Sequence, residues 1–381
     1  MVFDCGVSHA VLDFDPRELP ERLRDTVLSH SGEADHLRRL PGGLVDELRA
    51  AGAFRLLTPT ELGGFEVPVA TALEILEAFG RLDGSTAWVV WNGNIGVNAA
   101  ILPPAGSARI WATGADQIIA NYATPSGVAT PVDGGFVLSG RWPVVTGADF
   151  ADWITLFAVV ADRQGADHAD VRLFVVPRAD VTVSDTWDVT GMRGTASNRV
   201  TADNVFVPAE LSGQLGLPPV IDRPLYRVPA FSVVAPGGAA AVLGMARAAI
   251  DEVVRITVGS LASNAAVPAM LGRMDAERRA ARLLLLDAAA DLDRSAAADV
   301  PITDQQRAAL RAAMSHANQV SRNVFVSMHE LGGSTSLYRA NPLEQLVRDG
   351  LAATQHVNNA AVHFELAGQL MLGIQPDAPV Y

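Results

Sequence analysis

The spacing of hydrophobic residues changes twice along the chain. Residues 15–115 carry apolar residues at the spacing of helices, interrupted at turn residues such as Gly52 and Gly63. Short alternating runs follow, separated by Pro, Gly and Asp, and they favour strands at residues 117–122, 135–142, 153–160, 171–176 and 199–207. Beyond Pro229, long stretches rich in Ala and Leu predict helices at residues 236–258, 270–297, 304–331 and 341–372.

This order predicts an α+β fold in three parts. Strands at such short spacing, without helices between them, favour a small antiparallel barrel or sandwich. Four long amphipathic helices suffice for an antiparallel bundle. We therefore expect an N-terminal helical domain at residues 1–115, a β domain at residues 116–225 and a C-terminal four-helix bundle at residues 226–381.

Charge and composition limit the kinds of molecule that the protein is expected to bind. The chain has 29 basic and 42 acidic side chains, and this balance argues against nucleic acid or an anionic membrane as partner. The uncharged stretches at residues 85–108 and 228–246 are interrupted by Asn, Gly or Pro and do not indicate membrane spans. The N-terminus lacks a basic region followed by an apolar one, and Cys5 has no cysteine to pair with. We expect a cytoplasmic protein.

A narrow polar stripe is expected on the last predicted helix, residues 341–372. Asp349, His356 and His363 are seven residues apart and fall nearly on one line of such a helix. The histidines are either solvated or hydrogen-bonded helix residues, or titratable groups that face a site. No His-x-x-x-His motif or cysteine cluster accompanies them, so we expect no metal site.

A second candidate for a site is the uncharged stretch at residues 87–100, which follows a break with capping residues. It contains Trp88 and the amides Asn92, Asn94 and Asn98. Amide side chains are costly to bury without partners. They are therefore either satisfied in the core or line a cavity.

Three local motifs occur in order along the chain. They are DGSTAWV at residues 83–89, SGRWPVVTGAD at residues 139–149 and WDVTGMRGTASN at residues 187–198. Together with the helical, β, helical order, they resemble the acyl-CoA dehydrogenase superfold. More specifically, the chain looks like the two-component flavin monooxygenases of that fold, often called group D. The resemblance covers nearly the whole chain.

The resemblance implies a flavin site between the three parts. Isoalloxazine needs polar groups near its O2, O4 and N5 atoms and flat apolar surfaces on its faces. Tyr122, Thr124 and Thr146 would supply polar groups, and Trp142 a flat surface, although a strand tryptophan is also a common core residue. Arg193 would either orient phosphate or fix its own turn. Residues Trp88, Asn92 and Asn94 would line the substrate side of the pocket.

A glycine pair between the last two predicted helices extends this resemblance. In the family, the turn at Gly332 and Gly333 approaches flavin phosphates from a neighbouring subunit; otherwise it is a plain connection. A site shared in this way implies a homotetramer built as a dimer of dimers.

The candidate catalytic residues favour oxygenation over dehydrogenation. A dehydrogenase needs a carboxylate base, yet Val357 stands at one family position for it and residues 225–240 contain no acid. By resemblance, His356 and Thr146 would instead surround a C4a-hydroperoxide formed from reduced flavin and O2. Thr146 stands where the family more often has serine.

We therefore expect a flavin-dependent monooxygenase that uses FMN or FAD reduced by a separate reductase, because the chain has no Gly-x-Gly-x-x-Gly motif. Its substrate would be small, aromatic or heteroatom-containing: a phenol, indole, amine or sulfur compound, with a neutral group favoured near Asn92 and Asn94. Two other functions remain open, an acyl-CoA dehydrogenase-like flavin oxidoreductase and a non-catalytic flavin-fold module.

Overall fold

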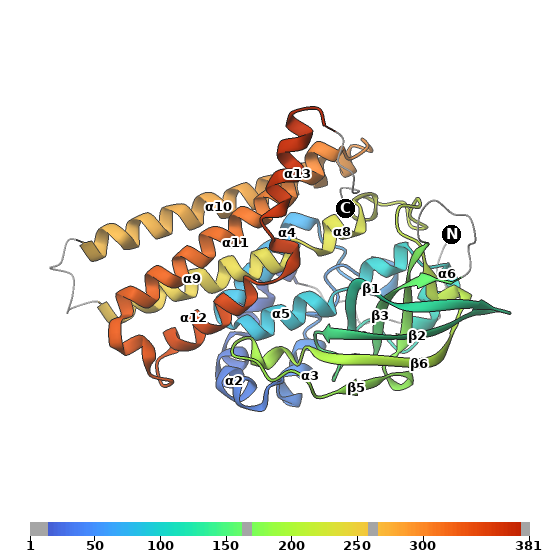
Figure 1. Cartoon of the computed structure of the whole chain (residues 1–381), viewed down its shortest axis with the longest axis horizontal. Helices are drawn as coiled ribbons and strands as arrows, with labels where there is room; N and C mark the ends of the chain where they lie inside the picture. Colours follow the sequence, from blue (N-terminus) through green and yellow to red (C-terminus); the bar gives the residue numbers. More distant parts are fainter. Residues whose placement is uncertain (1–13, 162–169, 258–265, 375–381) are drawn as a thin grey trace.

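The three predicted parts occur in the predicted order in the computed structural model, which describes residues 14–161, 170–257 and 266–374. The sheet lies at one end of the molecule and the long C-terminal helices extend toward the other (Figure 1). The N-terminal helices at residues 69–93 lie between these two parts, and those at residues 24–50 lie below them in this view. One hydrophobic core runs through all three parts. Cys5 lies outside the described residues.

The N-terminal part is helical. Its elements are η1 (Pro16–Glu18), α1 (Leu19–Arg22), α2 (Arg24–Leu37), α3 (Gly42–Ala50), η2 (Thr60–Leu62), α4 (Val69–Leu82), α5 (Gly84–Gly93), η3 (Gly96–Ala100) and α6 (Pro104–Ile110). The predicted helix at residues 87–100 is interrupted at Asn94, whose amide donates to Val90 O and Ala53 O. Helix α5 is capped by Asp83, which accepts the Thr86 N–H at 2.6 Å, and every residue of the helix is buried.

The central part is one seven-stranded sheet in the order β5-β6-β2-β1-β3-β4-β7. Its elements are β1 (Ile119–Val132), β2 (Gly135–Val145), β3 (Trp153–Val160), β4 (Val171–Pro177), η4 (Arg178–Asp180), β5 (Thr182–Ser184), η5 (Arg193–Thr195), β6 (Asn198–Pro208), η6 (Ala209–Leu211) and β7 (Ser212–Gly213). The pairs are antiparallel except β1 with β3, which run parallel. The β prediction is thus confirmed as a mostly antiparallel sheet.

The parallel pairing of β1 with β3 leaves part of β1 without a regular strand partner. Its register shifts between Tyr122 and Gly127, and β1 pairs with β2 only from Gly127 onward. The segment between these two residues is therefore excluded from regular pairing, and Tyr122 and Thr124 reach a cavity described below.

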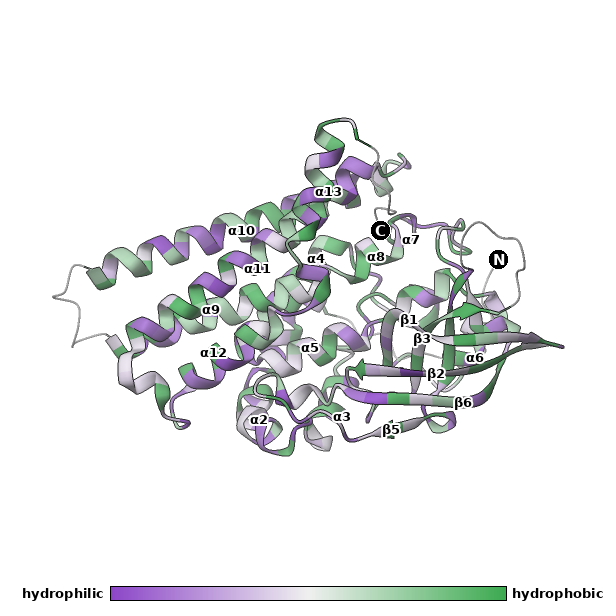
Figure 2. Cartoon of the chain, in the orientation of Figure 1, coloured by the Kyte–Doolittle hydropathy of each residue, from purple (hydrophilic) through white to green (hydrophobic). Residues whose placement is uncertain are grey.

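The C-terminal part holds the long helices. Its elements are α7 (Pro224–Arg227), α8 (Ala230–Val234), α9 (Gly237–Thr257), α10 (Ala266–Ala297), α11 (Asp304–Gly332), η7 (Gly333–Leu337), α12 (Pro342–Ala353), η8 (Val357–Asn359) and α13 (Val362–Met371). Hydrophobic and hydrophilic residues alternate in bands along α10 and α11, as expected for helices with one buried face (Figure 2). The segment Ala230–Thr257 is long and apolar enough to span a membrane, but 83% of its most apolar window is buried inside the protein.

The prediction of one helix over residues 341–372 is wrong. Helix α12 ends at Ala353, and α13 begins only at Val362. Polar side chains of α11 stabilise the interruption, because they satisfy carbonyls that a continuous helix would have paired. Ser315 donates to Ala360 O at 2.7 Å, and Asn318 donates to Thr354 O at 3.0 Å.

Two glycines allow an N-terminal helix, α4, to pack closely against α9 of the bundle. A Cβ on Gly80 of α4 would lie 2.2 Å from Ala241 O of α9, and one on Gly244 of α9 would lie 2.0 Å from Glu77 O of α4. Only glycine allows the two helices this contact. Because α5 follows α4 after a single residue, this crossing also fixes where α5 lies.

Candidate active site

A cavity of about 640 Å³ lies where α5, the sheet and the interruption between α12 and α13 meet. Its size falls within the range of about 300–1000 Å³ that is typical of small-molecule sites. Residues from all three parts of the chain line it, including α5, β1, β3, the turn at η5, α8 and η8. The cavity therefore exists only when the whole fold is assembled.

Three rings form one side of the cavity. Trp88 and Trp91 of α5 meet edge to face with ring centroids 4.7 Å apart, and the His356 imidazole packs against them at 5.4 Å and 5.3 Å. The Trp91 indole N–H donates to Val234 O at 2.6 Å, so α8 fixes the position of this ring.

His356 owes its position to the interruption after α12. It is the N-cap of η8, and its Nδ1 accepts the Asn358 N–H at 3.3 Å. The hydrogen of the neutral imidazole must then lie on Nε2. Burial lowers the pKa of His356 to about 4, so the ring is neutral near pH 7. His356 therefore offers a hydrogen-bond donor without a charge.

The other two members of the predicted stripe have different roles. Asp349 is buried away from the cavity and accepts the Met192 N–H at 2.7 Å. Burial raises the pKa of Asp349 to about 7, against the opposing effects of Arg348 and the Met192 N–H. His363 lies on α13 and does not line the cavity. The interruption of the helix is what separates the three residues.

Three hydroxyl groups form a second polar feature. Thr146 directly follows β2, and its Oγ1 lies 2.8 Å from Ser197 Oγ. Ser197 Oγ is in turn 2.8 Å from Thr195 Oγ1, which donates to Met192 O at 2.9 Å. All three hydroxyl residues line the cavity and are buried. The Gly147 N–H, donating to Thr195 O at 3.1 Å, holds the two segments together.

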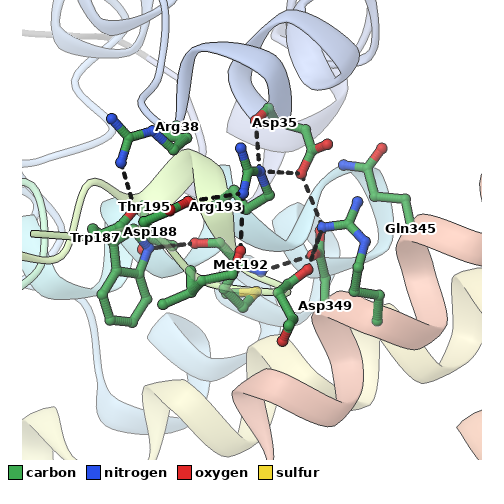
Figure 3. A network of polar contacts seen from close by, with 12 residues as sticks. Asp35, Arg38, Trp187, Asp188, Met192, Arg193, Thr195, Gln345 and Asp349 are labelled. Atoms are coloured by element: carbon green, nitrogen blue, oxygen red, sulfur yellow. Dashed lines mark hydrogen bonds and ion pairs between the residues drawn. The ribbon is translucent and has the colours of Figure 1, made fainter.

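The turn at residues 191–195 is anchored from several sides (Figure 3). Arg193 donates to Asp35 O at 3.1 Å and to Val189 O at 2.9 Å, so its guanidinium holds this turn against α2. Gly191 packs against α12, since a Cβ there would lie 2.4 Å from Arg348 O. Of the two roles predicted for Arg193, the contacts favour fixing the turn over orienting phosphate.

The amides on α5 separate into two groups. Asn92 lines the cavity; its Nδ2 donates to Trp88 O at 2.9 Å, and its Oδ1 lies 3.4 Å from Asn121 Nδ2. Asn94 does not line the cavity, contrary to prediction. Its amide is used within the fold, and its Oδ1 accepts the Leu56 N–H at 2.8 Å.

Trp142 also lies elsewhere than predicted. It is fully buried in the sheet, its indole N–H donates to Phe157 O at 2.9 Å, and Gly127 and Gly140 leave room for its ring. The register between β2 and β6 shifts between Trp142 and Val145, and Val144 lines the cavity instead. An irregularity of this kind cannot be read from the alternation of residues.

Of the predicted site residues, those that line the cavity are Trp88, Asn92, Tyr122, Thr124, Thr146 and His356. Gly332 and Gly333 lie at the end of α11 outside the cavity; Gly333 is exposed, with φ +54°. Sequence reasoning missed Trp91 as a ring partner of His356 and Ser197 as a partner of Thr146. Ser197 stands inside the third motif, which was the available signal.

The described residues that line the cavity carry no formal charge near pH 7. Among the described residues that line it there is no Asp, Glu, Lys or Arg, and its titratable groups are His356 and Tyr122. A carboxylate positioned for proton abstraction is therefore absent from this lining.

Two family models match the chain. Residues 113–205 match the acyl-CoA dehydrogenase middle domain, and residues 237–360 match the acyl-CoA dehydrogenase C-terminal domain. An indole-3-acetate monooxygenase of Pseudomonas putida is 31% identical over 368 residues, which cover 93% of this chain and 94% of that protein. An FADH2-dependent resorcinol hydroxylase, oxygenase component, of a Rhizobium species is 26% identical over 391 residues, covering 93% of each.

Solved structures agree with these matches. The 3-HSA hydroxylase from Rhodococcus sp. RHA1 superposes with a TM-score of 0.92 at 24% identity, covering 97% of this chain and 100% of that one. XiaF from a Streptomyces species, solved with FADH2 and glycerol, superposes with a TM-score of 0.88 at 28% identity, covering 96% of each chain.

Proposed function

Because the chain belongs to the two-component flavin-dependent monooxygenases of the acyl-CoA dehydrogenase fold, we propose that its cavity holds reduced flavin beside a small, neutral aromatic substrate. The enzyme is the oxygenase component, and a separate reductase supplies its flavin. The observation that carries the choice of reaction is the cavity lining, in which the described residues include a neutral imidazole and no carboxylate. An acyl-CoA dehydrogenase needs such a carboxylate as its base.

The residues of the cavity suit a flavin ring. Val144, Phe157 and Phe231 supply apolar surfaces, and Thr146, Tyr122 and Thr124 supply hydroxyls. Reduced flavin provides two electrons to O2, so that one oxygen atom enters the substrate and the other leaves as water. The protein contributes binding, orientation and exclusion of water from this reaction.

We assign His356 the role of an uncharged donor toward the reacting oxygen. Its Nδ1 is bound to the Asn358 N–H, which leaves Nε2–H as the donor. The edge-to-face contacts with Trp88 and Trp91 hold the ring in place. With its pKa lowered to about 4, His356 donates a hydrogen bond at neutral pH and does not act as a cationic acid.

The absence of charge in the lining indicates a neutral substrate. A substrate carboxylate buried here would meet no cation among the described lining residues, and an unpaired buried charge is costly. Asn92 Oδ1 has only a long contact, at 3.4 Å, and can accept a hydrogen bond. We therefore propose a one- or two-ring aromatic compound with an N–H or un-ionised O–H group, such as indole or a phenol, in preference to indole-3-acetate.

The oligomeric state and the identity of the flavin are also proposals that rest on the family. We propose a cytoplasmic homotetramer, a dimer of dimers, in which Gly332 and Gly333 of one subunit approach the flavin phosphates of another. In support, Gly333 is exposed and has open space at its Cβ position, which would let a phosphate approach the backbone. FMN and FAD are both candidates, and titration with each decides between them.

The test combines binding and oxygen transfer. The protein is mixed with reduced FMN or FAD, supplied by an unrelated flavin reductase, under ¹⁸O₂ with indole, phenol or indole-3-acetate. We expect one ¹⁸O atom in the product from a neutral substrate and little product from indole-3-acetate. Anaerobic reduction of bound flavin by an acyl-CoA, without reductase, would instead identify a dehydrogenase. Release of all oxidising equivalents as H2O2 with every substrate would contradict the proposed substrate class.

A further inference from the structure

We propose that Ser197 and Thr195 are positioning residues that force the Thr146 hydroxyl to accept, so that the cavity favours reduced over oxidised flavin. The inference rests on the proposed function and adds to it that the N5 edge of the bound flavin faces the Thr146 hydroxyl. The observation behind it is the direction of the hydrogen bonds that join the buried hydroxyls of Thr146, Ser197 and Thr195.

The direction follows from the last acceptor in the series. Met192 O is a carbonyl and has no hydrogen to give, so Thr195 Oγ1, 2.9 Å away, must donate to it. A hydroxyl has one hydrogen, and therefore Ser197 must donate across its 2.8 Å contact with Thr195. For the same reason, Thr146 must donate to Ser197 at 2.8 Å. The hydrogens of all three hydroxyls are thereby assigned.

The assignment leaves Thr146 with lone pairs only. Thr146 lines the cavity, and its Oγ1 can accept a further hydrogen bond but has no hydrogen left to donate. Reduced flavin carries a hydrogen on N5, whereas oxidised flavin has a bare lone pair there. Reduced flavin therefore gains a hydrogen bond from Thr146, and oxidised flavin places two acceptors against each other.

The rest of the fold prevents the series from reversing. The Met192 N–H donates to Asp349, and the Trp187 indole N–H donates to Met192 O at 2.9 Å, so the carbonyl is held in place (Figure 3). Thr195 is fully buried and Ser197 is 1% exposed, so water has little access to either hydroxyl as an alternative partner. Reversal would require Thr195 to leave Met192 O facing another oxygen without a hydrogen between them.

The size of the preference for reduced flavin follows from the cost of burying two acceptors, the oxidised N5 and Thr146 Oγ1, against each other. Leaving a buried acceptor unsatisfied changes binding by roughly tenfold or more. A preference of this size would help the oxygenase take reduced flavin from solution and release oxidised flavin after turnover. It would act through the dissociation constants, independently of the oxygen-transfer step.

The test is the ratio of dissociation constants for oxidised and reduced flavin, measured anaerobically by equilibrium dialysis with the full-length protein. In Ser197→Ala, Thr146 loses its acceptor and can turn its hydrogen toward N5. We expect oxidised flavin to bind more tightly, reduced flavin more weakly, and the ratio to fall by about tenfold. The midpoint potential of the bound flavin should shift downward accordingly.

Two further variants separate this effect from a general disturbance of the site. Thr195→Val, which has nearly the same shape, removes the acceptor of the Ser197 hydroxyl. Ser197 can then donate to Thr146, which frees the Thr146 hydrogen, and the ratio should fall in the same way. Thr195→Ser keeps a hydroxyl and should retain the wild-type ratio. Equal weakening of both flavin states in Ser197→Ala and Thr195→Val, with unchanged ratio, would overturn the inference while leaving the monooxygenase intact. Failure of the wild-type protein to bind either flavin state would instead refute the proposed function.

Discussion

At the scale of single residues, hydrogen-bond direction assigns roles that residue type alone does not. The residue types at His356 and Thr146 could be taken from the sequence and a family resemblance, and both side chains line the cavity. Their donor and acceptor states could not be read from the sequence. The state of His356 depends on the local turn, where Asn358 N–H binds its Nδ1. The state of Thr146 depends on Ser197, which is its neighbour only in the folded chain. The cavity thus presents a donor from one residue and an acceptor from the other.

Replacing His356 by Ala should uncouple oxygen consumption from hydroxylation. The variant loses the Nε2 donor, so hydroxylation should fall by roughly 100-fold while H2O2 release rises. The measurement is product and H2O2 per flavin oxidised. His356→Gln, which keeps an N–H at similar reach, serves as the matched control and should recover part of the coupling. Fully coupled turnover in His356→Ala would show that the imidazole has no part in oxygen transfer.

At the scale of elements, the largest error of sequence reasoning was the continuous helix at residues 341–372. Apolar spacing continues through the interruption, and neither Gly nor Pro occurs between Leu351 and Ala367. The adjacent Asn358 and Asn359 are the one local hint of a turn. The side-chain donors that stabilise the interruption, Ser315 and Asn318, belong to α11, far away in sequence, so a local pattern could not reveal them.

The contact between α11 and the interruption predicts a coupled loss of stability and activity. Asn318→Ala removes the donor to Thr354 O and should lower the free energy of unfolding by about 2 kcal/mol. It should also reduce the share of flavin oxidation that is coupled to hydroxylation, because the Thr354 carbonyl lies two residues before His356. Asn323→Ala, an exposed position on the same helix, is the control and should change neither quantity measurably. Urea unfolding and H2O2 yield together check this.

The anchor between α12 and the turn at η5 should give the protein a pH-dependent stability. Burial raises the pKa of Asp349 from 3.8 to about 7, so the folded protein binds this proton more tightly than the unfolded chain. Its stabilising contribution is present below about pH 4 and is lost as the pH rises toward 7, by at most about 1.4 kcal/mol per pH unit.

Asp349→Asn removes this titration while keeping an oxygen that can accept the Met192 N–H. The difference in unfolding free energy between variant and wild type should therefore shift in favour of the variant between pH 5 and pH 8. Burial lowers the pKa of His356 and adds the opposite slope from about pH 4 to 6.5, but this slope is common to both proteins and cancels. Parallel pH profiles of the two proteins would show that Asp349 is charged throughout this range.

At the scale of the whole molecule, the order of the three parts was predictable because the hydrophobic spacing changes from helical to strand-like and back where one part meets the next. How the parts meet was not, since the crossing of α4 and α9 depends on glycines that a periodicity analysis treats as weak helix residues. Gly80 and Gly244 permit the backbone contact on which the position of α5, and so of Trp88, depends. The cavity is therefore as sensitive to this distant crossing as to its own lining.

Gly244→Ala tests that dependence. The added Cβ would lie 2.0 Å from Glu77 O, a backbone atom that cannot move without shifting α4, so we expect a loss of several kcal/mol in unfolding free energy together with weaker flavin binding. Gly272 on α10 is the matched control, because its Cβ position has nothing within 4 Å. There the same substitution should stabilise the protein by about 0.5–1 kcal/mol through helix propensity alone. Opposite signs for the two variants would locate the effect in the helix crossing, whereas two stabilising substitutions would mean that α4 and α9 can separate without cost to the cavity.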